Sequence, residues 1–200
     1  MIRRRISRLL PTLVATAVLA GPAHSAADDA PWRPVEGREL IGTPAPEWRN
    51  LDWIQGGPLA LEELRGRAVL VRFWLVGCPY CRMSAPALVR LHEEYGDRGL
   101  TVVGIHHPKS EASKDPDLVR RAARHYGFEF PVALDNRWST IRAYGVGSAF
   151  TRFTSVSFLI GPDGVIRWVH DGGAYTPGDG EEGRAYEALV AAIERWLPEG

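Results

Sequence analysis

Apolar residues along this chain form two patterns, short continuous runs and longer stretches with helical spacing. The longest run, AVLVRFWLV at residues 68–76, is apolar throughout except for one arginine. Such a run is typical of a strand buried on both faces of a sheet. LTVVGI at 100–105 and FPVALD at 130–135 predict two further strands. Residues 156–170, VSFLIGPDGVIRWVH, predict a hairpin because a Gly-Pro-Asp-Gly turn separates two strand-like segments.

Helical patterns separate these runs. Apolar residues recur at helical spacing after residue 81, at Leu88, Leu91 and Tyr95. Residues 113–127 predict a second helix, whose N-cap is Ser113 or Asp115. Residues 137–146 predict a short helix. In the closing segment a last helix is predicted by one apolar face, made of Tyr186, Leu189, Val190, Ile193, Trp196 and Leu197.

The order of these elements is strand, helix, strand, helix, strand, helix, hairpin and helix, which predicts an α/β sandwich with a mixed central sheet. Two connecting segments carry predictions of their own. The GGP at residues 56–58 predicts a turn between short extended pieces. The segment DGGAYTPGDGEEG, residues 171–183, is expected to be a solvated connection.

The first part of the chain differs from the rest. Residues 1–25 combine four arginines, an apolar run of about 15 residues and small residues at the end, the pattern of a signal peptide. The run is shorter than the roughly 20 residues that span a bilayer, so we expect cleavage and no stable membrane span, with an uncleaved anchor as the alternative. Residues 26–37 are expected to be a flexible lead-in. Residues 38–200 are long enough for one compact domain.

Charge and cysteine content narrow the function. The chain has 24 basic and 24 acidic residues, and removal of the leader's four arginines leaves 20 basic against 24 acidic. No basic stripe remains, so nucleic acid is not expected as a partner. The exported protein is expected to be soluble, in the periplasm or an equivalent space. Its only two cysteines, Cys78 and Cys81, stand in GCPYC.

Three interpretations of the cysteine pair can be compared. A disulfide between Cys78 and Cys81 closes such a short loop that it would stabilise little. Structural zinc needs about four ligands, which a single pair does not supply. A soft copper site could use both thiolates with Met83, His106 and His107, which makes a copper-binding chaperone the alternative function.

A redox pair explains the position of the cysteines better. Cys78 follows a buried strand and begins a helix, where unpaired N–H groups and partial positive charge favour a thiolate. Pro79 suits the first helical turn because it has no N–H to lose. Cys78 is then the exposed attacking residue, and Cys81, one turn further, is the buried residue that resolves the mixed disulfide.

AVLVRFWLVGCPYCRMSAP resembles the active-site segment of thioredoxin-fold proteins. The flanking LEELRGRAVLVRFW, LHEEYGDRGLTVVGIHHP and SFLIGPDGVIRW are similar to exported TlpA/ResA-type reductases, and residues 106–136 to the thioredoxin-like domain of DipZ-type proteins. The resemblance covers residues 38–197. It implies a three-layer sandwich, a helix kinked at Pro86, protein thiol and disulfide clients, a membrane-bound thiol electron donor, and no dissociable organic cofactor.

Several positions depart from these families. Pro79 and Tyr80 resemble glutaredoxins, which are less reducing than thioredoxins, at about −200 to −230 mV against about −270 mV. Gly77 replaces the usual tryptophan before the first cysteine, which should open the surface around Cys78. Leu75 stands where thioredoxin-fold peroxidases require threonine, so a peroxidase is not expected.

The acids that accept a proton in these families are also missing. Arg72 occupies the place of the buried aspartate of thioredoxins, and Ser84 that of the glutamate of ResA-type proteins. His106 or His107, at the end of the neighbouring strand, could be the base, although a surface histidine at a strand end explains them equally well.

The family's cis-proline is replaced as well. Ser155 stands in its place, and we expect a trans peptide or an altered loop there because a cis bond without proline costs about 2.5–4 kcal/mol. In the family that proline contacts substrate and discourages metal capture. Among other supporting positions, Trp74 is expected to pack beside the site, and Tyr80 to touch a partner.

The sequence therefore predicts an exported thiol–disulfide oxidoreductase that acts on protein disulfides through Cys78 and Cys81, as a reductase. Oxidation or isomerisation stays open as the direction of the reaction. Besides the copper chaperone, the remaining rival is a binding protein whose cysteines are idle.

Overall fold

The computed structural model of the chain describes residues 37–147 and 153–198. All of these belong to one compact unit that begins at residue 34. The expected signal peptide, 1–25, and the lead-in up to residue 36 lie outside the described residues. In the described ranges no helix is both long enough and apolar enough to cross a membrane.

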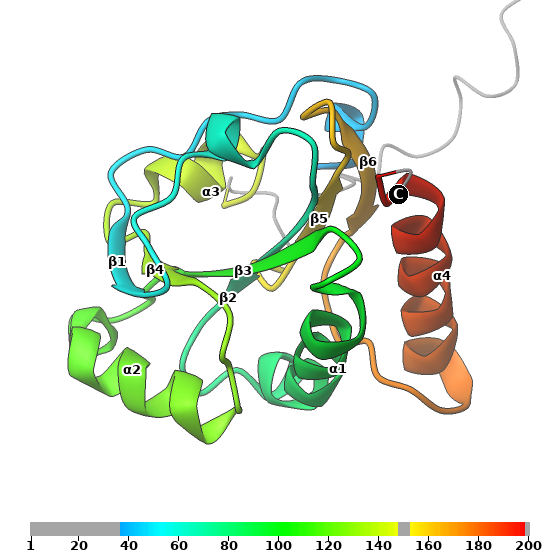
Figure 1. The fold of residues 1–200 in the computed structure, drawn as a ribbon. Coiled ribbons are helices and arrows are strands. Elements are labelled where there is room, and N and C mark those ends of the chain that lie inside the picture. The colour runs from blue at the N-terminus through cyan, green and yellow to red at the C-terminus, as the bar shows by residue number, and fades with distance from the viewer. Residues whose placement is uncertain (1–36, 148–152, 199–200) are drawn as a thin grey trace, which may run out of the picture. The chain divides into compact units, whose positions relative to one another are not determined.

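A six-stranded mixed sheet forms the centre of the fold, in the order β1-β4-β3-β2-β5-β6 (Figure 1). β2, β3 and β4 are parallel, whereas β1, β5 and β6 join antiparallel. The strands are β1 Asp52–Gln55, β2 Ala68–Trp74, β3 Leu100–His106, β4 Val132–Leu134, β5 Ser157–Ile160 and β6 Ile166–His170.

Helices cover both faces of the sheet. The helices are α1 Pro79–Tyr95, α2 Pro116–His125, α3 Ser139–Ala143 and α4 Gly180–Trp196, with short 3-10 helices at Arg38–Leu40, Leu61–Leu64 and Ala112–Lys114. α1, α2 and α4 share one apolar core with one face of the sheet, and α3 packs on the opposite face (Figure 1). This is the three-layer α/β sandwich expected from the sequence.

The central strand β2 explains why its sequence is apolar at every position. It pairs with β3 on one side and β5 on the other, and all seven of its residues are buried. Leu70 and Trp74 contribute to the core under α1, while Val71 and Phe73 contribute to the opposite core. Burial on both faces favours β-branched and aromatic residues throughout.

Local differences from the expectation have simple causes. The strand predicted over 68–76 ends at Trp74, because the next residues turn into α1 and are only partly buried. A 3-10 helix, Leu61–Leu64, follows the GGP turn where an extended piece was expected. Of the two caps proposed for α2, Asp115 is the one: its carboxylate accepts the backbone N–H of Asp117 at 2.9 Å.

Candidate active site

The strand-to-helix junction places both cysteines at one end of the central sheet. Cys78 is the N-cap residue of α1, and Pro79 is its first helical residue. The Cys78 Sγ accepts a hydrogen bond from the backbone N–H of Cys81 at 3.2 Å. Cys78 is half-buried and Cys81 is only 2% exposed, and both are free thiols. The exposed and buried positions expected for the two cysteines are therefore present.

The acidities of the two thiols are opposed. The pKa of Cys78 is lowered to about 6, first by the hydrogen bond from the Cys81 side chain, then by the Cys81 backbone N–H and the positive charge of Arg72, against burial. The pKa of Cys81 is raised by its hydrogen bond to Cys78 and by burial, and Arg72 opposes that rise. The stable reduced form is thus a thiolate at Cys78 beside a thiol at Cys81.

Aromatic side chains lie beside and beneath the pair. Tyr80, between the cysteines, is 41% exposed, and its ring meets Phe153 edge-on at 5.5 Å between centroids. Trp74 is buried in the same core as Cys81 and contacts Phe128 edge-on at 5.4 Å. Trp74 therefore belongs to the apolar core that contains Cys81, and the Tyr80 ring is partly exposed to solvent.

The two candidate bases, His106 and His107, are both fully buried. The interpretation of them as surface residues is therefore wrong. His106 is the register partner of Trp74, and their rings are 5.2 Å apart; His107 contacts Trp138 of the opposite core at 5.1 Å. Only His106 therefore shares the Cys81 side of the sheet.

Burial also changes what these histidines can do. Burial lowers the pKa of His106 to about 4 and that of His107 well below its ordinary value. Within the described ranges neither ring nitrogen of either residue has a hydrogen-bond partner. Both imidazoles are neutral at pH 7 and are weak proton acceptors.

A buried polar network lies behind the active-site helix. Arg72, in the middle of β2, is 1% exposed. Its Nη1 donates to the Ser157 Oγ at 3.3 Å, its Nη2 donates to the Gly173 carbonyl at 3.0 Å, and its guanidinium stacks over the Tyr175 ring at 5.1 Å. The Tyr175 hydroxyl shares a hydrogen bond with Ser157 at 3.0 Å.

This network corrects the expectation for residues 171–183. Tyr175 is completely buried, and its backbone N–H donates to the Ser84 Oγ of α1 at 3.1 Å. The segment is therefore not a wholly solvated connection, because part of it packs against the helix that carries the cysteines. Arg72 and Ser84, the two positions at which the resembling families carry acids, are joined by the same network. The one sign of this network in the sequence was a single arginine inside an otherwise apolar strand.

Ser155 lies in the loop before β5 and is 3% exposed. The cis bond found in the described ranges is at Gly57-Pro58, so the peptide before Ser155 is trans, as expected. The loop is tied to β2 by a hydrogen bond from the Phe73 N–H to the Val156 carbonyl at 2.9 Å.

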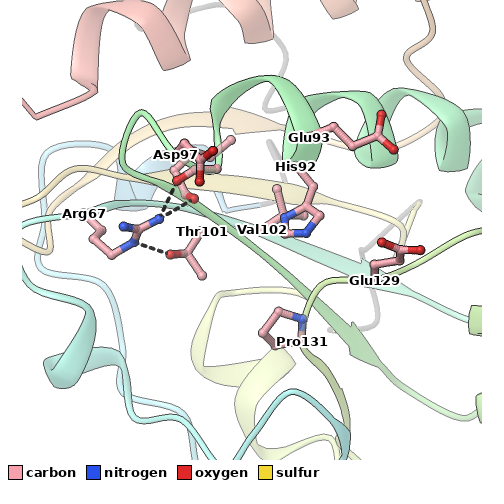
Figure 2. Close-up of a pocket in the computed structure, with 10 residues that line it drawn as sticks. Arg67, His92, Glu93, Asp97, Thr101, Val102, Glu129 and Pro131 are labelled. Carbon is pink, nitrogen blue, oxygen red and sulfur yellow. Dashed lines mark hydrogen bonds between the residues drawn. The ribbon is translucent and has the colours of Figure 1, made fainter.

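A hollow away from the cysteine pair lies around the first residues of β3 and the last turn of α1 (Figure 2). One of its lining residues is Arg67, which donates to the Thr101 Oγ1 at 2.8 Å and to the carbonyls of Gly96 at 2.9 Å and Leu100 at 2.8 Å. The arginine fixes the turn between α1 and β3, and none of the candidate site residues lines this hollow. Across the described residues, no group of three or more His, Cys, Asp and Glu side chains could hold a metal.

Comparisons with known proteins agree with the fold described above. The model of the AhpC/TSA family matches residues 41–169. DipZ of Mycobacterium bovis is 34% identical over 138 residues, which are 67% of this chain and 19% of DipZ. Thiol-disulfide oxidoreductase ResA of Halalkalibacterium halodurans is 32% identical over 124 residues, 62% of this chain and 64% of ResA.

The solved structures agree as well. A thiol:disulfide interchange protein of the thioredoxin family from Chlorobium tepidum TLS is 24% identical, with a TM-score of 0.57 over 78% of this chain and 97% of that one. This likeness shows the fold. Together with the sequence matches, it confirms the resemblance to thioredoxin-like proteins of the ResA and DipZ types. The chain spans only about a fifth of DipZ and less than two thirds of ResA.

Proposed function

The chain belongs to the AhpC/TSA family, and we propose that it is an exported thiol–disulfide oxidoreductase that reduces protein disulfides through Cys78 and Cys81. The observation that carries this proposal is the difference in exposure and acidity between the two cysteines. Cys78 is accessible and acidic, whereas Cys81 is buried and holds its proton. The oxidoreductase names of relatives such as ResA support the same assignment.

The first step uses the Cys78 thiolate. It attacks one sulfur of a client disulfide, the client S–S bond breaks, and a mixed disulfide joins Cys78 to the client. The second client sulfur leaves as a thiolate and takes a proton from water. A thiolate with a pKa near 6 is almost fully formed at neutral pH, so no separate base is needed for this step.

The second step uses Cys81. Its thiol loses a proton, its sulfur attacks the Cys78 Sγ, and the client's remaining sulfur leaves. The client has then gained two electrons and two protons, and the pair is a disulfide. Because the pKa of His106 is only about 4, the leaving client thiolate, with an ordinary pKa of ~8.5, is the better acceptor for the Cys81 proton. A catalytic role of His106 or His107 stays a prediction.

A groove beside the pair suits contact with a client chain. It has a volume of about 520 Å³ and is lined by Tyr80, Phe153, Trp168 and residues of β6 and α4. Exposed aromatic side chains supply large contact areas at low conformational cost. We assign protein clients on this basis, with Tyr80 as the contact nearest the reacting sulfur. Ser155, which is nearly buried, is a weaker candidate for client contact.

A reductase must be reduced again after each turnover. The balance of electrons requires a dithiol donor, and a membrane-bound donor outside the cytoplasm fits the leader expected at residues 1–25. Stabilisation of the Cys78 thiolate favours the reduced state of the pair, so its potential should be less negative than the roughly −270 mV of thioredoxin.

Reduction of insulin by the purified protein, with dithiothreitol as donor, tests this function. Cys78→Ser should abolish the activity. Cys81→Ser should accumulate a mixed disulfide between Cys78 and insulin, visible as a reducible adduct by mass spectrometry. Equal activity in the wild type and Cys78→Ser would reject the proposal.

A further inference from the structure

Arg72 is a buried cation for which the described structure provides no carboxylate. The side chain is 1% exposed, and no ion pair found in the described ranges includes it. Its Nε has no hydrogen-bond partner there. Burying a charge is costly unless an opposite charge and hydrogen bonds compensate it. The position of Arg72 therefore requires an explanation.

The contacts that hold the guanidinium are all neutral. Ser157 on β5 and the Gly173 carbonyl accept its hydrogen bonds, and the Tyr175 ring lies against it. These groups orient the side chain but cannot neutralise it. The network also reaches α1, because Tyr175 binds Ser84, three residues after Cys81. Arg72 is thus fixed with respect to the helix that carries the cysteines.

The ionisable groups around Arg72 leave one source of negative charge. From β6 and the end of β3, His170 and His107 feel its charge, and burial keeps both neutral. Tyr175 also stays neutral, because burial raises its pKa. The remaining groups on which Arg72 acts are the thiols of Cys78 and Cys81. The Asp171 carboxylate, which also acts on His170, forms an ion pair with Arg38 at 3.2 Å. Among the described groups that interact with Arg72, the thiol pair is therefore the source of an anion at neutral pH.

We infer that Arg72 is a positioning residue of the redox pair, a fixed buried cation whose counter-ion is the Cys78 thiolate and which therefore favours the reduced form. The inference rests on the proposed function. When the pair is reduced, its disulfide takes up two electrons and one proton and becomes a thiolate at Cys78 and a thiol at Cys81. In the disulfide form the anion is gone, and Arg72 is left without a counter-ion.

This role inverts the chemistry that the resemblance implies at the same place. An aspartate there would accept a proton from the resolving cysteine, whereas an arginine cannot accept one. Arg72 instead acts on the thiolate through its charge. Its expected effect is to make the pair more oxidising, because stabilising the reduced form raises the reduction potential.

The test removes the charge of Arg72 and measures the redox equilibrium of the cysteine pair and the pKa of Cys78. Arg72→Met keeps an unbranched side chain of similar length without charge, and Arg72→Lys keeps the charge as a matched control. The redox equilibrium with glutathione and the ultraviolet absorbance of the thiolate as a function of pH are read out. For Arg72→Met we expect a three- to tenfold shift toward the disulfide, which is about 14 to 30 mV at ~29.6 mV per tenfold, and a higher pKa of Cys78.

Arg72→Lys should stay close to the wild type in both readouts. The same values in wild type and Arg72→Met, or equal shifts in Arg72→Met and Arg72→Lys, would overturn the inference. Ser157→Ala, which removes a contact of Arg72 but no charge, shows how far a merely structural loss moves the potential. It should move it less than Arg72→Met does.

A further measurement needs no variant. Urea unfolding should show that the reduced wild type is more stable than the disulfide form, because only reduction gives Arg72 a counter-ion. The opposite order would contradict the inference even if Arg72→Met failed to fold. The proposed function fails separately, if the wild type exchanges no disulfide with insulin while its Cys78 acidity still depends on Arg72.

Discussion

The backbone N–H of Cys81 points at the sulfur of Cys78, 3.2 Å away. Because Cys78 caps the helix that Cys81 belongs to, the start of α1 brings the two residues of the pair into contact. The same hydrogen bond lowers the pKa of Cys78 and holds Cys81 next to the sulfur that it attacks in the proposed mechanism. The lowered pKa of Cys78 and the position of Cys81 beside its sulfur therefore have one structural origin.

Tyr80 should matter for protein clients and hardly for small thiols. Its ring is 41% exposed and meets the Phe153 ring edge-on, so Tyr80→Ala should change the free energy of unfolding by less than about 0.5 kcal/mol. We expect insulin reduction to slow about tenfold, a typical loss for an aromatic contact residue. Reduction of oxidised glutathione should be nearly unchanged.

Tyr80→Phe keeps the ring and is the matched control, with insulin reduction close to that of the wild type. An equal loss with both substrates in Tyr80→Ala would mean that the tyrosine acts on the cysteines and not on the client.

Tyr175 should contribute to stability through its hydroxyl. Tyr175→Phe removes the hydrogen bond shared with the buried Ser157, so the free energy of unfolding should fall by about 1 kcal/mol, as urea titration would measure. Tyr80→Phe removes a hydroxyl from an exposed ring and should cost much less. A Tyr175→Phe protein as stable as the wild type would contradict the network described around Arg72.

Stability should fall in mild acid because His106 is buried and neutral. Its pKa in the folded protein is about 4, below the ~6.5 of the unfolded chain, so the unfolded state binds a proton first as the pH falls. From pH 6.5 toward 4 this histidine alone should remove about 1.4 kcal/mol of stability per pH unit. Urea unfolding at a series of pH values measures the slope.

His106→Gln should reduce that slope by about the same amount, ~1.4 kcal/mol per pH unit, while the exposed His125→Gln leaves it unchanged. His107 and His170 add to the slope in both variants, since burial lowers their pKa values too. Identical slopes in the wild type and His106→Gln would show that His106 is not buried in solution.

Copper binding separates the proposed oxidoreductase from the alternative chaperone. We expect the reduced protein to lose Cu(I) to a competing chelator at an equimolar concentration, because Cys81 is buried and its raised pKa keeps it a thiol, so the pair does not offer two thiolates to the metal. Tight binding of one Cu(I) that disappears in Cys78→Ser would favour the chaperone. A Met83→Ala variant would then show whether the exposed thioether of Met83 takes part.

Patterns in the sequence were sufficient for most of the fold and for the two candidate reacting residues. The strands of the centre are apolar because both faces are buried, and the cysteine pair follows a buried strand at the start of a helix, so both features could be recognised locally. Tyr175 could not. The segment 171–183 that contains it is rich in glycine and acidic residues, which is typical of a loop, and the burial of Tyr175 depends on Ser84 and Ser157, which are distant along the chain.

The histidines illustrate the same limit. Their position at the end of β3 could be predicted, but their burial depends on Trp74 and Trp138, which belong to other elements. Similarly, Arg72 was recognisable as a departure from thioredoxins, whereas its partners come from β5 and from the segment after β6. Side-chain environments of this kind require the tertiary structure.

The most direct test of the account is the rate at which iodoacetamide alkylates Cys78 as a function of pH in the reduced protein. A thiolate held at the start of α1 should give a rate that rises with a midpoint near pH 6 and is level above pH 7, while Cys81 stays unreacted. A midpoint near the ~8.5 of an ordinary cysteine, or equal labelling of both cysteines, would contradict the proposed exchange mechanism.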